Sequence, residues 1–183
     1  MIWESCYWKD DLLRTALRLR RRQSQRRWSE ASLANVEKDL FIGFYSVRKL
    51  MDANKLSDSS LSMSISITEH SGLEKSITNM NWHRLDELYD LENPRPGKLG
   101  LRALCNQIVH SYVFVTVLND KNQGLDGIMI ASDREKSSRL YQIPVDEIVR
   151  VFEIVGNDYP NQREATWDSK LGDYVVHQEM VLD

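Results

Sequence analysis

The chain has 183 residues, of which 42% are hydrophobic and 28% are charged, and its formal net charge is −3. This balance excludes disordered, collagen-like and disulfide-rich chains and fits one globular domain of ordinary size. No apolar run approaches the roughly 18 residues of a membrane span, and no basic start followed by an apolar run marks a signal peptide. We therefore expect a soluble, cytoplasmic protein that has no contact with a membrane.

The charge is unevenly distributed along the chain. Between Lys9 and Arg27 there are eight basic residues against only two acids, Asp10 and Asp11. Such a run is typical of a surface that contacts nucleic acid or another acidic partner, although a solvated helix face paired with acids elsewhere would have the same composition. The residues that we predict to contact an anionic partner are Arg18, Arg20, Arg21, Arg22, Arg26 and Arg27.

Hydrophobic spacing predicts most of the first half to be helical. Ser29 is placed to cap the second helix, in which Phe41 and Phe44 belong to an apolar face and should be buried. Residues 61–68 alternate strictly between apolar and polar types, which predicts a half-exposed strand. Residues 93–97 hold two prolines and a glycine, which predicts a break. The helices predicted in this half cover residues 8–27, 30–54, 82–91 and 98–110.

The second half is predicted to be rich in strands. Pro144 is expected to open a further helix at its first turn, and Gly156 with Asn157 is expected to end it. The predicted strands cover residues 112–118 and 127–131, which form a hairpin, then 139–143 and a short last strand at 174–176. Together these elements predict an α+β fold, with residues 1–183 as a single domain. In it, residues 1–111 form a bundle of about four helices, and residues 112–183 form a small antiparallel sheet with one further helix.

Residues that could carry chemistry are sparse. No glycine-rich phosphate loop, nucleophile elbow or metalloprotease motif is present, the four histidines are scattered, and the two cysteines do not form a CxxC pair, so we expect no metal and no cofactor. One helix, however, places Arg102, Asn106 and His110 four residues apart on one face. These groups could hold a phosphodiester while the imidazole moves protons. The same stripe is also what an ordinary amphipathic helix presents to solvent, with His110 near its end.

The pair Asn106-x-x-x-His110, near the end of the fourth predicted helix, resembles the motif of the HEPN superfamily. The resemblance covers about the first 110 residues and implies a four-helix bundle. Many members act as metal-independent ribonucleases in toxin–antitoxin, CRISPR and phage-defence systems. The family's arginine just before the asparagine is replaced here by Cys105, and seven residues separate Arg102 from His110, too many for the pattern. The resemblance therefore implies a non-catalytic relative or a diverged active site.

Three functions follow as hypotheses. The first is a non-catalytic binding or accessory protein, a subunit of a bacterial or phage-related complex, possibly one used in defence, that engages a protein partner or further copies of itself. The second is a metal-independent ribonuclease with Arg102, Asn106 and His110 as a diverged site. The third is a regulator that binds nucleic acid through its arginine-rich first helix. Because no catalytic set is intact, we favour the first.

Overall fold

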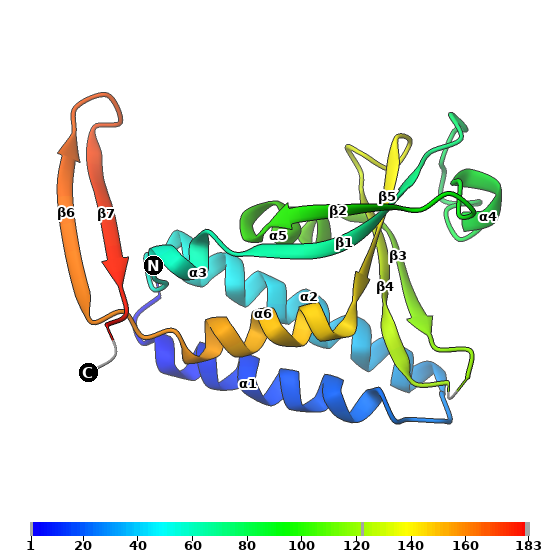
Figure 1. Cartoon of the computed structure of the whole chain (residues 1–183), viewed down its shortest axis with the longest axis horizontal. Helices are drawn as coiled ribbons and strands as arrows, with labels where there is room; N and C mark the ends of the chain where they lie inside the picture. Colours follow the sequence, from blue (N-terminus) through cyan, green and yellow to red (C-terminus); the bar gives the residue numbers. More distant parts are fainter. Residues whose placement is uncertain (1, 122, 182–183) are drawn as a thin grey trace.

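The computed structural model describes residues 2–121 and 123–181, which fold into a mixture of helices and strands (Figure 1). The helices are α1 (Ser5–Arg22), α2 (Glu30–Asp52), α3 (Asp58–Leu61), α4 (Leu85–Leu88), α5 (Leu101–Val109) and α6 (Val145–Asn157). The strands are β1 (Ser64–Ser71), β2 (Arg95–Gly100), β3 (Ser111–Leu118), β4 (Leu125–Ser132), β5 (Arg139–Pro144), β6 (Gln162–Asp168) and β7 (Asp173–Glu179). The mixture of helix and strand confirms the α+β class.

Five strands form one antiparallel sheet in the order β2-β1-β5-β4-β3, and β6 pairs with β7 in a separate hairpin. The large sheet is strongly twisted, so that β1 and β2 run across β3, β4 and β5 in Figure 1. On one of its faces lie α2, α5 and α6, while α1 forms an outer layer against α6 and α2. The segment 72–94 with α4 covers the other face through a smaller apolar cluster that includes Leu88 and Tyr89.

The main core lies between the helices and the sheet. Ile65 and Ile67 of β1 point into it while Ser64 and Ser66 face solvent, which confirms the alternation read from the sequence. Phe44 of α2 is fully buried and packs on Phe152 of α6, with ring centroids 4.9 Å apart. The main core therefore joins strands and helices from both halves of the chain.

The predicted bundle of four helices within residues 1–111 is wrong. The predicted third helix, over residues 82–91, is reduced to the single turn of α4, and α5 packs on α2 and the sheet. The principal partner of α1 is α6, from the second half of the chain. Gly156 permits this contact, because a Cβ at that position would lie 2.6 Å from Cδ2 of Leu13 on α1. Gly156 is the penultimate residue of α6, which ends at Asn157 as predicted, with Asp158 as the C-cap.

Several predicted boundaries also need correction. Residues 93–97 were predicted as a break, but β2 begins at Arg95 and pairs with β1, with Pro96 opposite Thr68. An edge strand tolerates proline because no ladder hydrogen bond is required on its outer side. The helix expected from residue 98 therefore begins only at Leu101. The hairpin of β3 and β4 is confirmed, whereas β6 was missed.

Candidate functional site

Arg102 and Asn106 belong to a polar network that links α5 to α2. Arg102 donates to Oδ1 of Asp52 at 3.1 Å, and Arg48 donates to Oδ2 of the same carboxylate at 3.0 Å and also to Oδ1 of Asn106. Burial alone would raise the pKa of Asp52, but the hydrogen bonds from the two arginines outweigh it and hold that pKa below its ordinary value. The carboxylate is therefore charged at neutral pH and retains both guanidinium groups.

The three predicted site residues on α5 are not brought to one point. The rise between Arg102 and His110 is about 12 Å, at about 1.5 Å per residue, and Arg102 points to Asp52 at the end of α2. His110 is the exposed C-cap of α5, where its backbone N–H donates to the carbonyl of Asn106. One guanidinium cannot serve Asp52 and a phosphate beside His110 at the same time.

His110 instead faces a groove that the turn after β4 completes. The groove has a volume of about 550 Å³. Its lining residues are Ala103, Asn106, Gln107, His110, Ser132, Asp133, Arg134 and Glu135. A guanidinium, Arg134, thus shares the groove with the imidazole of His110 and the amide of Asn106. The sequence alone does not indicate Arg134, because this residue lies 24 positions after His110 and no spacing rule connects them.

Acidic groups share the groove and are held in place by hydrogen bonds. Glu135 accepts from Nε2 of Gln107 at 3.0 Å and from the hydroxyl of Tyr141 at 2.8 Å. Burial, followed by this hydrogen bond, raises the pKa of Tyr141 to about 12, so the phenol keeps its proton. Asp133 is paired with Lys136 at 2.7 Å. The groove can hold a polar group, but its carboxylates oppose an anionic one.

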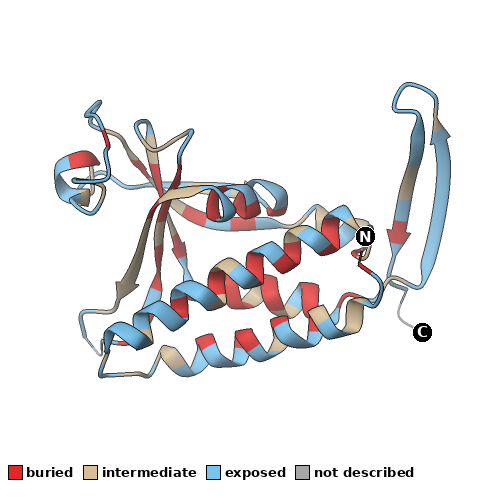
Figure 2. Ribbon diagram, turned by 180° about the vertical axis from the view of Figure 1, so that it is seen from behind, coloured by how far each residue is buried: buried red, intermediate tan, exposed pale blue. Residues whose placement is uncertain are grey.

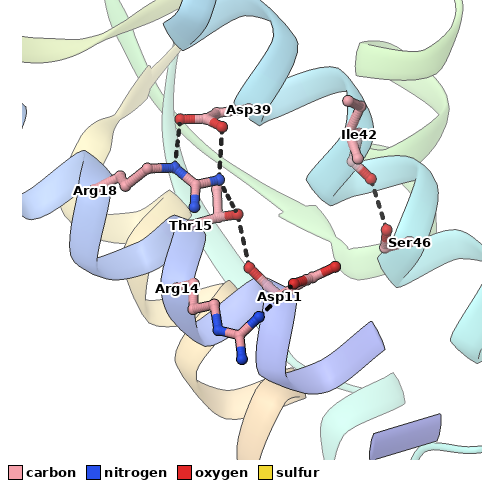
Figure 3. A network of polar contacts seen from close by, with 7 residues as sticks. All are labelled: Asp11, Arg14, Thr15, Arg18, Asp39, Ile42 and Ser46. Atoms are coloured by element: carbon pink, nitrogen blue, oxygen red, sulfur yellow. Dashed lines mark hydrogen bonds and ion pairs between the residues drawn. The ribbon is translucent and has the colours of Figure 1, made fainter. Parts of the chain in front are cut away.

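The arginines of α1 separate into two groups. Arg18 donates to both carboxylate oxygens of Asp39 on α2 at 2.7 and 3.1 Å (Figure 3). Arg20 does the same to Glu153 on α6, at 2.8 and 2.9 Å. These hydrogen bonds raise the pKa of each arginine above its ordinary value. Both side chains therefore tie α1 to its neighbouring helices, and each is already paired with a carboxylate.

Four further arginines lie at the end of α1 or just after it. We call Arg21, Arg22, Arg26 and Arg27 the basic corner. Arg22 donates to Oε1 of Gln25 and stacks over the ring of Trp28, 5.8 Å from its centroid. In the described part of the chain, Arg21, Arg26 and Arg27 have no side-chain hydrogen bond or ion pair, and all three are exposed.

The loop after α1, which carries Arg26 and Arg27 of the basic corner, is held against the body of the protein. The indole N–H of Trp28 donates to the backbone carbonyl of Gln123 at 2.7 Å, which links residues 23–29 to the loop between β3 and β4. Gln25 donates to the carbonyl of Arg27 at 2.7 Å. The corner is therefore positioned before any partner arrives, which lowers the entropy lost on binding.

Residues 2–121 and 123–181 contain no group of three or more His, Cys, Asp or Glu side chains placed to hold a metal ion. Nor does any helix within these ranges have the length and apolar character needed to cross a bilayer. Comparisons of the chain with family models, with curated proteins and with solved structures found no match.

Proposed function

We propose that this chain is a non-catalytic binding protein, a subunit of a larger complex, and that its basic corner contacts an anionic partner. The observation that carries the proposal is the contrast among the arginines near α1. Arg18 and Arg20 are neutralised by Asp39 and Glu153, whereas the guanidinium groups of Arg21, Arg26 and Arg27 have no ion-pair partner among residues 2–121 and 123–181.

The physical argument rests on charge in a chain that is acidic overall. The formal net charge of −3 repels a polyanion at long range, so binding depends on a local cluster of cations. Guanidinium groups donate in a fork that matches phosphate or carboxylate oxygens. Arg21 lies near the end of α1, and Arg26 and Arg27 lie on the loop held by Trp28, so this corner offers three such groups to phosphates.

The experiment measures binding of fluorescein-labelled single-stranded RNA by anisotropy across a salt series. Changing Arg21, Arg26 and Arg27 together to Gln should flatten the log–log salt slope by up to about two units, because each lost phosphate contact removes about 0.7 on a single strand. The matched control changes Arg18 and Arg20 to Gln, removes charge from the same helix and should leave the slope unchanged.

Two outcomes would count against this use of the corner. If the wild type does not bind RNA at low salt, the anionic partner is not single-stranded RNA, and an acidic protein surface becomes the better proposal. If the two variants flatten the slope equally, the distinction between paired and unpaired arginines has no functional meaning.

One observation favours a second candidate, a metal-independent ribonuclease. Arg134 lines the groove in which His110 and Asn106 lie, so a cation, an amide and an imidazole are present together. Such a site would use Arg134 in place of Arg102. Asp133 and Glu135 in the same groove oppose phosphate binding, which is why we place this function second. Cleavage of RNA in EDTA that is lost in both His110→Ala and Arg134→Ala would establish it.

A further inference from the structure

The hairpin of β6 and β7 projects from the rest of the molecule as an arm (Figures 1 and 2). Residues 162–167 of β6 are all exposed, and in Figure 2 the arm is pale blue along most of its length. A two-stranded hairpin alone is marginally stable in water, whereas three or more strands with an apolar face are stable. The arm therefore lacks strands that would complete it.

The two edges of the arm differ. Along β7, Asp58 of α3 accepts a hydrogen bond from the backbone N–H of Gln178 at 3.4 Å and lies 2.9 Å from Nδ1 of His177. Gln178 also donates to the carbonyl of Asn54 at 2.8 Å, which secures the base of the arm. β7 is the inner strand, against α3, and no described strand pairs with the outer side of β6. β6 is thus a free edge of seven residues without proline.

The two faces of the arm differ as well. Cross-strand pairs share a face, so Trp167 with Tyr174 and Ala165 with Val176 lie on one side of the arm. Trp167 is 55% exposed and Tyr174 is 59% exposed, although their rings contact each other at 5.1 Å. On the same face, toward the base of the arm, Arg163 is opposite Gln178. One face is therefore aromatic at its tip and cationic near its base.

We propose that two copies of this chain associate through their arms, with β6 of one copy antiparallel to β6 of the other and a twofold axis at Ala165. In this register Arg163 lies opposite Trp167 of the partner subunit, as in a cation–π pair, and the twofold axis forms this pair two times. On the other face, Gln162 lies opposite Asp168 of the partner subunit, and Glu164 lies opposite Thr166 of the partner subunit. No like charges face each other across the pair of strands.

The association pairs the free edge of β6 and adds the strands that the isolated arm lacks. The free edge of β6 gains backbone hydrogen bonds, and the two hairpins become one four-stranded antiparallel sheet. The exposed aromatic pair at each tip then lies beside the base of the other arm. Other registers are less favourable. A shift of one residue would place Arg163 and Trp167 on opposite faces. A shift of two would bring Glu164 opposite Glu164 or Asp168 of the partner subunit, which pairs like charges.

The test uses the full chain in sedimentation-velocity runs over a wide range of concentration. Ala165→Lys places two ammonium groups directly opposite each other at the axis and should weaken self-association on the order of tenfold or more. Thr166→Lys is the matched control: it adds the same charge one residue away, opposite Glu164 of the partner subunit, and should preserve or strengthen the dimer. Circular dichroism checks that both variants keep the fold of the wild type.

A second readout reports the register itself. In a Cys6→Ser background, mild oxidation should join two copies of Ala165→Cys, whose side chains are opposite each other at the axis. Gln162→Cys should remain unlinked, since its two copies would be about 20 Å apart at about 3.3 Å per residue. A wild type that stays monomeric at every concentration, equal effects of the two lysines, or equal cross-linking at both cysteines would overturn the proposal.

Discussion

Gly43 of α2 lies against the ring of Phe152 on α6, so Gly43→Ala tests how closely these helices approach. A Cβ at Gly43 would be 2.9 Å from Cε2 of Phe152 and nearer still to Cζ. The ring is fully buried and packs on Phe44, 4.9 Å away, so it cannot move aside without displacing a second buried ring.

The change in the free energy of unfolding caused by Gly43→Ala is the sum of two opposing effects. Alanine favours the helix over glycine by about 1 kcal/mol. Overpacking a close-packed core costs about 1–3 kcal/mol, and contact with a fully buried ring places this site near the upper value. The net loss should be about 2 kcal/mol, which for a chain of this size lowers the Tm by about 4–8 °C.

Thermal and urea unfolding measure the effect, with Gly100→Ala as the matched control. Gly100 has an ordinary φ of −72°, and nothing lies within 4 Å of a Cβ built there, so its change should stay within about 0.5 kcal/mol. In a Phe152→Leu background the clashing ring atoms are gone, and Gly43→Ala should cost less. If Gly43→Ala is as stable as the wild type, α2 and α6 do not approach as described.

Three further changes test other parts of the structure. Phe44→Ala should lower the free energy of unfolding in urea by about 3–5 kcal/mol. Phe41→Ala should lower it clearly less, because Phe41 is only half-buried, and equal losses would contradict this difference in burial. Burial raises the pKa of Cys105 from its ordinary value of 9.0 to about 12. The folded state therefore keeps a proton that the unfolded state releases, and the free energy of unfolding should fall as pH rises from 9, by up to about 1.4 kcal/mol per pH unit. Cys105→Ala should flatten this fall between pH 9 and 10, and an unchanged slope would exclude the thiol as its source. Trp28→Phe removes the hydrogen bond to Gln123 and should weaken RNA binding while keeping the salt slope; a flatter slope would mean that Trp28 positions more than the loop.

Local features of the fold could be predicted where a residue type or its spacing favours one structure, as a helix cap or an alternating strand does. Ser29 caps α2, with its hydroxyl accepting from the N–H of Ser32 at 3.2 Å. Ile65 and Ile67 alternate with serines because one face of β1 is buried. β6 could not be predicted in this way, because both of its faces are exposed in the isolated chain and no burial pattern separates its polar and apolar residues.

The candidate sites depended on contacts between distant segments. The sequence places Asn106 and His110 on one face of a helix, and both do line one groove. It could not show that Asp52 holds Arg102, 50 positions away, or that the turn after β4 brings Arg134 to His110. Likewise, the arginine run alone could not show that Asp39 and Glu153 neutralise Arg18 and Arg20, because these partners belong to α2 and α6.

We propose above that the chain binds an anionic partner and does not cleave it. The most direct measurement incubates end-labelled single-stranded RNA with the wild type in EDTA at low salt, records the anisotropy, and then resolves the same sample on a denaturing gel. We expect a rise in anisotropy with the RNA recovered intact. Time-dependent shortening of the RNA that is lost in His110→Ala, at matched folded concentration, would contradict the claim and make this chain a ribonuclease.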